Sequence, residues 1–161
     1  IKDQITLIKS TQKILEDGNE IKLRLIGSGA TLHSCKRYVV ENKLSKYIIF
    51  EKEIAHEKLN NFYNSIDLFV LPSYYEASAC VLMEAWATET PILSIKNQGI
   101  SELIPEYEID NLLADEKSPI SLKEKILGEY NRKRSYPFDE KYDIKNTIKE
   151  FMNYSFFKSD E

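Results

Sequence analysis

Two glutamates separated by seven residues, Glu76 and Glu84, are the side chains in this sequence best placed to do chemistry. Glu84 is the only charged residue between Glu76 and Glu89, and its neighbours are almost all apolar, which is typical of a buried helix. A carboxylate in such a setting is costly unless it has a partner. Glu76 follows a short apolar run, in a loop that a ligand could reach. The pair therefore indicates a binding site for a polar ligand.

A strand, a loop, a helix and a second strand must position these two glutamates. Residues 68–71 are all apolar and are followed by Pro72 and Ser73, which is typical of a buried strand in a parallel sheet. Residues 79–88 lack Gly and Pro and are rich in helix formers, and residues 91–93 start the next strand. Ligands of open α/β sheets bind at the carboxyl edge of the strands, where this loop begins.

The predicted helix face that carries Glu84 is otherwise made of small residues. By i, i+3, i+4 spacing it also holds Cys80, Ala87 and Thr88, so a ligand can come close to it. A structural role stays open for both glutamates. Glu84 would then be a buried carboxylate bonded to backbone N–H groups of a neighbouring loop, and Glu76 a solvated loop charge.

Length and composition fit one soluble globular domain. The chain has 161 residues, of which 42% are hydrophobic and 30% charged, with a net charge of −4 and a pI of about 5.4. That balance gives no electrostatic footprint for nucleic acid, and neither a membrane-spanning stretch nor a signal peptide is visible. Cys35 and Cys80 are too few for a disulfide framework, which indicates a reduced, cytoplasmic protein. We expect Cys80 to be a small buried residue, and the isolated His33 and His56 to be surface residues rather than metal ligands.

Strands alternate with helices along the chain, which predicts an α/β fold: a Rossmann-like parallel sheet of five strands with helices on both faces. The other expected helices cover residues 3–16, 32–42, 56–64, 118–130 and 136–152. The strand over 21–26 ends in Gly27-Ser28-Gly29, a turn that lets backbone approach a phosphate or sugar. Glu51, about 20 residues further on, stands where a dinucleotide site needs an acid, which keeps a nicotinamide-binding oxidoreductase open as an alternative.

The stretch PSYYEASACVLMEAWATETPIL resembles the E-x7-E motif of retaining GT-B glycosyltransferases of family 4, also called glycosyl transferases group 1. The usual pattern is P-S-x-x-E-G-F-G-x-x-x-x-E-A-M-A-x-G-x-P-V-I. Seven positions match it: Pro72, Ser73, Glu76, Glu84, Ala85, Ala87 and Pro91. The sequence departs from it at Ala77, Ala79 and Glu89, where glycine is common. The resemblance begins at Lys2 and runs to about Met152, nearly the whole chain.

The resemblance implies the C-terminal, donor-binding domain of an enzyme that transfers a sugar from a nucleotide-diphosphate sugar, in bacterial surface polysaccharide or glycolipid synthesis. Glu76 would be the catalytic residue that contacts the transferred sugar, and Glu84 would contact the ribose hydroxyls. The other implied donor contacts are Lys2, Gly27, Ser28, Gly29, Lys52, Ala77, Ser78, Ala79, Cys80 and Val81. Free N–H groups at the start of the helix near Ala79 suit a diphosphate. No metal or cofactor is implied, since the nucleotide sugar is itself a substrate.

The domain is expected to cover residues 1–152, with an apolar tail over 153–161. The family's first strand and its N-terminal acceptor domain are expected to be missing, so this chain alone would be inactive. For a full-length enzyme, peripheral membrane association stays open. A function of another class also fits: a non-catalytic nucleotide-sugar-binding or interaction module with a decayed site, favoured by the departures at Ala77, Ala79 and Glu89.

Overall fold

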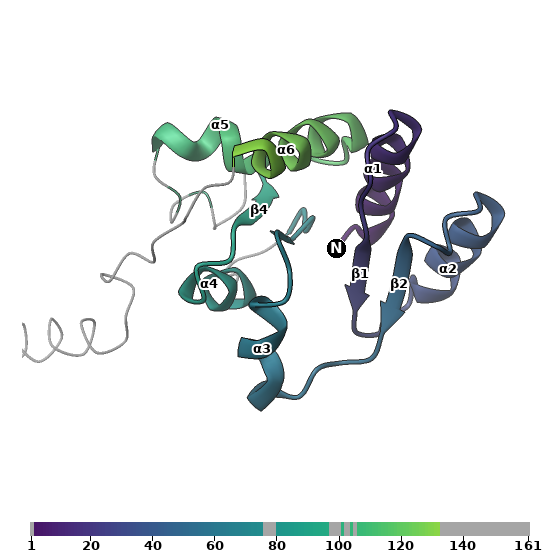
Figure 1. Ribbon diagram of the computed structural model, residues 1–161, viewed down its shortest axis with the longest axis horizontal. Coiled ribbons are helices and arrows are strands. Elements are labelled where there is room, and N and C mark those ends of the chain that lie inside the picture. Colours follow the sequence, from purple (N-terminus) through teal and green to yellow (C-terminus); the bar gives the residue numbers. More distant parts are fainter. Residues whose placement is uncertain (1, 76–79, 97–100, 102–103, 105, 133–161) are drawn as a thin grey trace, which may run out of the picture.

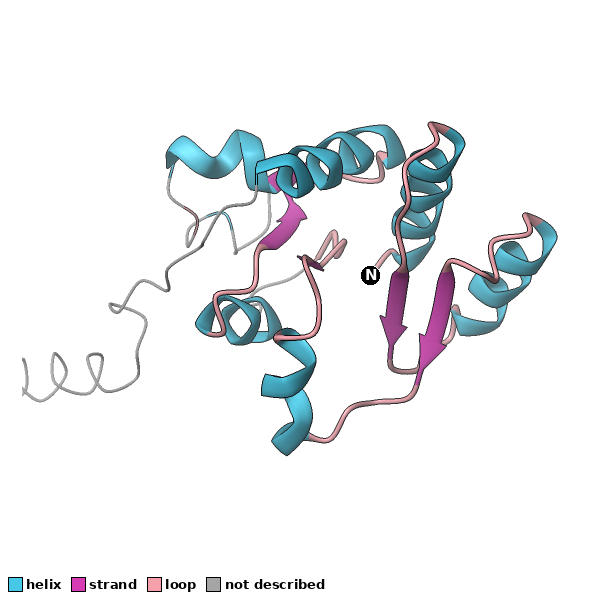
Figure 2. Cartoon of the chain, viewed as in Figure 1, coloured by secondary structure: helices cyan, strands magenta, loops and turns pink. Residues whose placement is uncertain are grey.

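The computed structural model describes residues 2–75, 80–96, 101, 104 and 106–132. Helices and strands alternate through these residues (Figures 1 and 2), which confirms the predicted α/β fold. In chain order they are α1 (Gln4–Glu16), β1 (Leu23–Ile26), α2 (Leu32–Glu41), β2 (Ile48–Glu51), a 3₁₀ turn (His56–Lys58), α3 (Leu59–Tyr63), β3 (Phe69–Val70), α4 (Cys80–Ala87), β4 (Ile92–Ile95), a 3₁₀ turn (Glu106–Glu108), α5 (Ile109–Leu112), β5 (Leu113–Ala114) and α6 (Pro119–Arg132). The helix expected over 136–152 and the tail over 153–161 lie outside the described residues.

All strand pairs in the described part of the chain are parallel, as predicted. β1 pairs with β2, with Leu23 opposite Ile48, and β3, β4 and β5 pair in that order. The difference from expectation is that the strands form two hydrogen-bonded groups instead of one sheet. The division falls between β1 and β3, which are not paired with each other.

One apolar cluster holds the two strand groups together. Its buried members come from α1, β4, β5 and α6, and the partly buried Leu25 of β1 and Val70 of β3 pack against them. Helix α6 lies beside α1 (Figure 1), and the Lys123 ammonium donates to Asp17 at 2.7 Å. Burial of apolar side chains, rather than a continuous ladder of backbone hydrogen bonds, therefore connects the two halves.

Helix α4 buries only one of its faces. Leu82, Ala85 and Trp86 are buried in a second cluster with Tyr63 of α3, whereas Cys80 is exposed. The expectation of a helix buried on most sides is therefore wrong, and so is the expectation of a buried Cys80. The apolar composition of this helix could not show which of its faces meets the sheet, because that depends on distant elements.

Three helices end with the same pair of backbone hydrogen bonds, known as a Schellman motif. The second residue after each helix donates to a carbonyl three positions back, and the next residue donates five positions back: Gly18 to Leu15 and Asn19 to Ile14 after α1, Lys43 to Val40 and Leu44 to Val39 after α2, Glu89 to Trp86 and Thr90 to Ala85 after α4. The first donor in each case has a left-handed backbone, with φ of 83°, 58° and 58°. Glycine adopts this conformation most readily, which fits the glycine that the resembled motif has at the position of Glu89.

Candidate functional site

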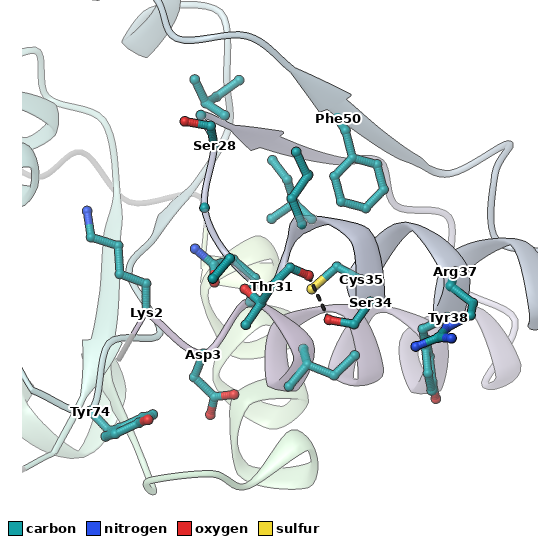
Figure 3. Close-up of a pocket in the computed structure, with 18 of the residues that line it drawn as sticks. Lys2, Asp3, Ser28, Thr31, Ser34, Cys35, Arg37, Tyr38, Phe50 and Tyr74 are labelled. Atoms are coloured by element: carbon teal, nitrogen blue, oxygen red, sulfur yellow. Dashed lines mark hydrogen bonds between the residues drawn. The ribbon is translucent and has the colours of Figure 1, made fainter.

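A pocket of about 740 Å³ opens at the carboxyl end of β1, beside the starts of α1 and α2. It brings together four of the predicted donor contacts, Lys2, Gly27, Ser28 and Gly29. Figure 3 shows Lys2, Asp3 and Tyr74 along one side of the pocket and Thr31, Ser34 and Cys35 across from them. The pocket thus brings Lys2 and Asp3 together with the turn after β1 and with Tyr74, which lies after β3.

The Gly27-Ser28-Gly29 turn is held by bonds on both of its sides. The Gly27 N–H donates to the Glu51 carbonyl at 3.1 Å, which continues the β1–β2 ladder, and the Ser28 hydroxyl donates to the Glu53 carboxylate at 3.0 Å. Gly27 has φ of 107°, and an added Cβ would find its nearest atom, a carbon of Glu53, at 4.0 Å. Backbone conformation rather than lack of space therefore requires glycine at position 27.

Lys52 lies in a second hollow at this turn. This hollow has a volume of about 610 Å³, shares Gly27, Ser28, Leu32 and Phe50 with the first pocket, and also includes Lys36. The two hollows meet at the turn, with Lys2 in the lining of the first and Lys52 in the lining of the second. The predicted set is therefore gathered around the turn, although not within a single cavity.

Glu84 is fixed by a side chain that sequence reasoning missed. Its Oε2 accepts a hydrogen bond at 2.9 Å from the hydroxyl of Tyr63, a residue only 3% exposed. Burial is the main cause that raises the pKa of the Tyr63 hydroxyl, and the bond to Glu84 adds to it. The Tyr63 carbonyl in turn accepts from the Thr90 hydroxyl at 3.0 Å. Among the described residues nothing donates to Glu84 Oε1, so half of this carboxylate is open to another partner.

The α4 residues are separate from the pocket in the described part of the chain. Cys80, Val81 and Glu84 do not belong to its described lining. The predicted catalytic residue Glu76 and the predicted contacts Ala77, Ser78 and Ala79 lie outside the described residues. The structure thus brings Lys2 together with the Gly27-Ser28-Gly29 turn. The E-x7-E part of the site stays a prediction.

Two pocket residues escaped sequence reasoning. Tyr74 follows the strand-ending Pro-Ser pair directly, so its place at the carboxyl edge of the sheet was a signal that could have found it. Cys35 is 3% exposed in the pocket wall, and burial raises the pKa of its thiol. No signal in the sequence pointed to Cys35, because α2 turns it inward only through contacts with α1 and the first two strands.

The carboxylate of Glu51 is occupied by an arginine on the neighbouring strand. Arg24 Nε and Nη2 donate to its two oxygens at 2.6 and 2.9 Å, and the guanidinium also lies 5.0 Å from the centre of the Phe62 ring. The hydrogen bond from Arg24 is the main cause that lowers the pKa of Glu51. A carboxylate held in this bidentate way is poorly placed to bind a ribose, which argues against the dinucleotide-binding alternative.

We expect Glu51→Gln to destabilise the domain by about 1 kcal/mol at pH 7, because a half-exposed ion pair contributes little more. The folded-state pKa of Glu51 is lowered, so its stabilisation is present above the carboxyl's ordinary pKa and is lost as the pH falls through the lowered value. Urea unfolding of wild type and variant should therefore differ at pH 7 and converge in acid. Glu57→Gln, at an exposed position without an ion pair among the described residues, is the control; a difference that persists unchanged into acid would contradict the role of the pair.

The fold and the pocket define this chain as a Rossmann-like α/β domain with an open hollow at the carboxyl edge of its strands. Residues 2–134 match the model of the family described as glycosyl transferases group 1. The chain belongs to this family, and its fold is that of the GT-B glycosyltransferases.

Its relatives include glycosyltransferases from archaea and bacteria. An uncharacterized glycosyltransferase of Methanocaldococcus jannaschii is 29% identical over 91% of this chain and 40% of its own length. The D-inositol 3-phosphate glycosyltransferase of Corynebacterium efficiens is 31% identical over 70% of this chain and 28% of its own length. A mutant of S. aureus TarM, solved with UDP, superposes with a TM-score of 0.75 at 16% identity over 94% of this chain and 32% of that one. The chain thus spans 40% or less of the length of these proteins. None of the helices that the structure describes is long and apolar enough to cross a membrane.

Proposed function

We propose that this chain is the donor-binding part of a retaining glycosyltransferase that uses a nucleotide-diphosphate sugar, in bacterial surface polysaccharide or glycolipid synthesis. The observation that carries the proposal is the pocket in which Lys2 meets the Gly27-Ser28-Gly29 turn at the carboxyl end of β1. A cation beside a backbone turn of this kind suits an anionic diphosphate. Membership of the glycosyltransferase family supports the same reaction class.

The chemistry of the transfer explains what each group would do. Breaking the bond from the anomeric carbon to the diphosphate leaves negative charge on the leaving group and an oxocarbenium-like sugar. Lys2 and the free N–H groups at the start of the helix near Ala79 are proposed to stabilise the departing diphosphate. Such preorganised groups act most strongly where water is excluded. Glu76 is the residue proposed to face the transferred sugar, and the open oxygen of Glu84 is proposed to accept from the ribose.

Transfer to an acceptor is proposed to need residues beyond this chain. The support is the length of the relatives, of which the chain spans 40% or less. Binding of a nucleoside diphosphate, by contrast, is proposed to need only residues of this chain. Sugar transfer catalysed by the purified 161-residue chain would contradict this part of the proposal.

We expect the purified chain to bind at least one of UDP, GDP and ADP more tightly than NAD in isothermal titration calorimetry. The reason is that the pocket offers a lysine and backbone groups for a diphosphate, whereas Glu51, the acid that a dinucleotide site needs, is bonded to Arg24. NAD bound more tightly than all three nucleotides would favour the oxidoreductase alternative. Binding of none of the four would overturn the proposal. Binding of the donor by the full-length protein without sugar transfer would favour the alternative of a non-catalytic nucleotide-sugar-binding module.

A further inference from the structure

We propose that Lys117 is a further phosphate-binding residue of this pocket, held beside it by the ring of Tyr74; this inference rests on the proposed function. The Lys117 ammonium lies 4.5 Å from the centre of the Tyr74 ring, and Tyr74 lines the pocket together with Lys2. The two residues come from separate parts of the chain, Tyr74 after β3 and Lys117 after β5. Because both strands pair in parallel with β4, their carboxyl ends lie at one edge of the sheet.

The backbone around Lys117 is held in a defined turn. Lys117 has a left-handed φ of 52°, which is uncommon for a residue with a side chain. The Ser118 N–H donates to the Asp115 carbonyl at 3.3 Å, and the Ser118 hydroxyl accepts from the Ser121 N–H at 3.1 Å as the cap of α6. A strained conformation persists where the surroundings fix it, and here the turn directs the lysine toward Tyr74.

The charges near Lys117 leave it available for an anion. Lys96, which directly follows β4, is bonded to Asp115 at 3.0 Å. Among the described residues, the ion-pair partner of Lys117 is the adjacent Glu116, at a long 3.8 Å, and the Lys117 side chain is 63% exposed. The described lining of the pocket holds two acids, Asp3 and Glu41, and two bases, Lys2 and Arg37, and Asp3 lies on the same side as Lys2 and Tyr74 (Figure 3). On this side of the pocket, Lys2 in the lining and Lys117 against the Tyr74 ring outnumber the acid Asp3, which favours an anionic ligand.

A cation on an aromatic ring is a suitable resting state for such a residue. The attraction between an exposed ammonium and an aromatic face is weak, whereas a charge-assisted hydrogen bond to a phosphate oxygen is stronger. A diphosphate entering the pocket would therefore draw the Lys117 ammonium away from the ring. The Tyr74 ring restricts the flexible Lys117 side chain to conformations in which its ammonium already lies beside the pocket.

The test is the affinity of Lys117→Met for UDP and for uridine, measured by calorimetry beside the wild type; GDP or ADP with its nucleoside replaces them if it binds more tightly. We expect UDP to bind about tenfold more weakly and uridine to bind as in the wild type, because only UDP carries the phosphates. Lys117→Arg should keep most of the UDP affinity. Lys46→Met is the matched control, since Lys46 makes a similar contact with the Tyr47 ring at 5.5 Å but precedes β2 and lies at the amino end of the strands.

The outcomes separate this inference from the proposed function. If the wild type binds UDP and Lys117→Met binds it equally well, the inference is overturned and the proposed function stands. The same holds if Lys117→Met loses as much affinity for uridine as it loses for UDP. If the wild type binds none of UDP, GDP and ADP, both fall. Tyr74→Leu should reduce UDP affinity less than Lys117→Met does, because it removes the resting contact and keeps the charge; an equal loss of UDP and uridine in this variant would contradict the role given to the ring.

Discussion

Glu84→Gln is expected to weaken binding of a nucleoside diphosphate by about 10- to 100-fold, with little change in the melting temperature. A carboxylate that accepts from ribose hydroxyls loses charge-assisted bonds worth about 1.5–3 kcal/mol when it becomes an amide. Glutamine has nearly the same shape, and its amide oxygen can still accept from the Tyr63 hydroxyl, 2.9 Å away in the wild type. Calorimetry with UDP, GDP and ADP, beside thermal unfolding, checks both halves of the expectation.

The ribose role can be separated from a structural one with a modified ligand. On the wild type a 2′-deoxynucleotide should bind more weakly than the ribonucleotide, and on Glu84→Gln that difference should shrink, as in a double-mutant cycle. Tyr63→Phe is the matched protein control: it removes the hydroxyl that holds Glu84 and leaves the carboxylate, so stability should fall more than affinity. A sharp loss of melting temperature in Glu84→Gln with unchanged affinity would show that Glu84 serves the fold alone.

Leu122→Ala is expected to destabilise the domain by about 3 kcal/mol, the usual cost of removing a fully buried leucine side chain. Leu122 is 0% exposed and belongs to the cluster that joins the two strand groups. The cavity would open where α6, α1 and the strands meet, so few neighbours could collapse into it. Urea unfolding followed by circular dichroism measures the effect.

The control for this prediction lies in the same helix. Ile120 is 56% exposed, so Ile120→Ala removes a similar side chain without opening a cavity, and its effect should stay within about 0.5 kcal/mol. A small effect at both positions would mean that the cluster does not hold the two strand groups together. A broad or two-step transition in Leu122→Ala would instead show that the groups unfold separately once their shared core is damaged.

Local features of the sequence predicted the parts of the fold that depend on neighbouring residues. The apolar run before Pro72 became β3, with hydrogen bonds that reach Leu71, and the Gly-Ser-Gly turn has the left-handed backbone that its first glycine allows. His33 and His56 are exposed, as predicted. In each case the residue types themselves restrict the backbone or the burial.

The parts that escaped prediction depend on partners far apart in the chain. Glu84 meets Tyr63, 21 residues away, and Lys117, which follows β5, meets Tyr74, which follows β3. Glu51 fitted the spacing of a ribose-binding acid, yet Arg24 on the next strand takes both of its oxygens. Spacing along the sequence cannot show which side chains the pairing of strands will bring together.

The shared ending of α1, α2 and α4 has a consequence for heat tolerance. Only α1 has glycine at the left-handed position, whereas α2 and α4 have Lys43 and Glu89, and a residue with a Cβ loses about 1 kcal/mol in that conformation. Both side chains are exposed, so they gain no packing in return. The fold would therefore be more stable if these two positions held residues that adopt the left-handed conformation without cost. The stability is lost at two surface positions, Lys43 and Glu89, neither of which lines the described pocket.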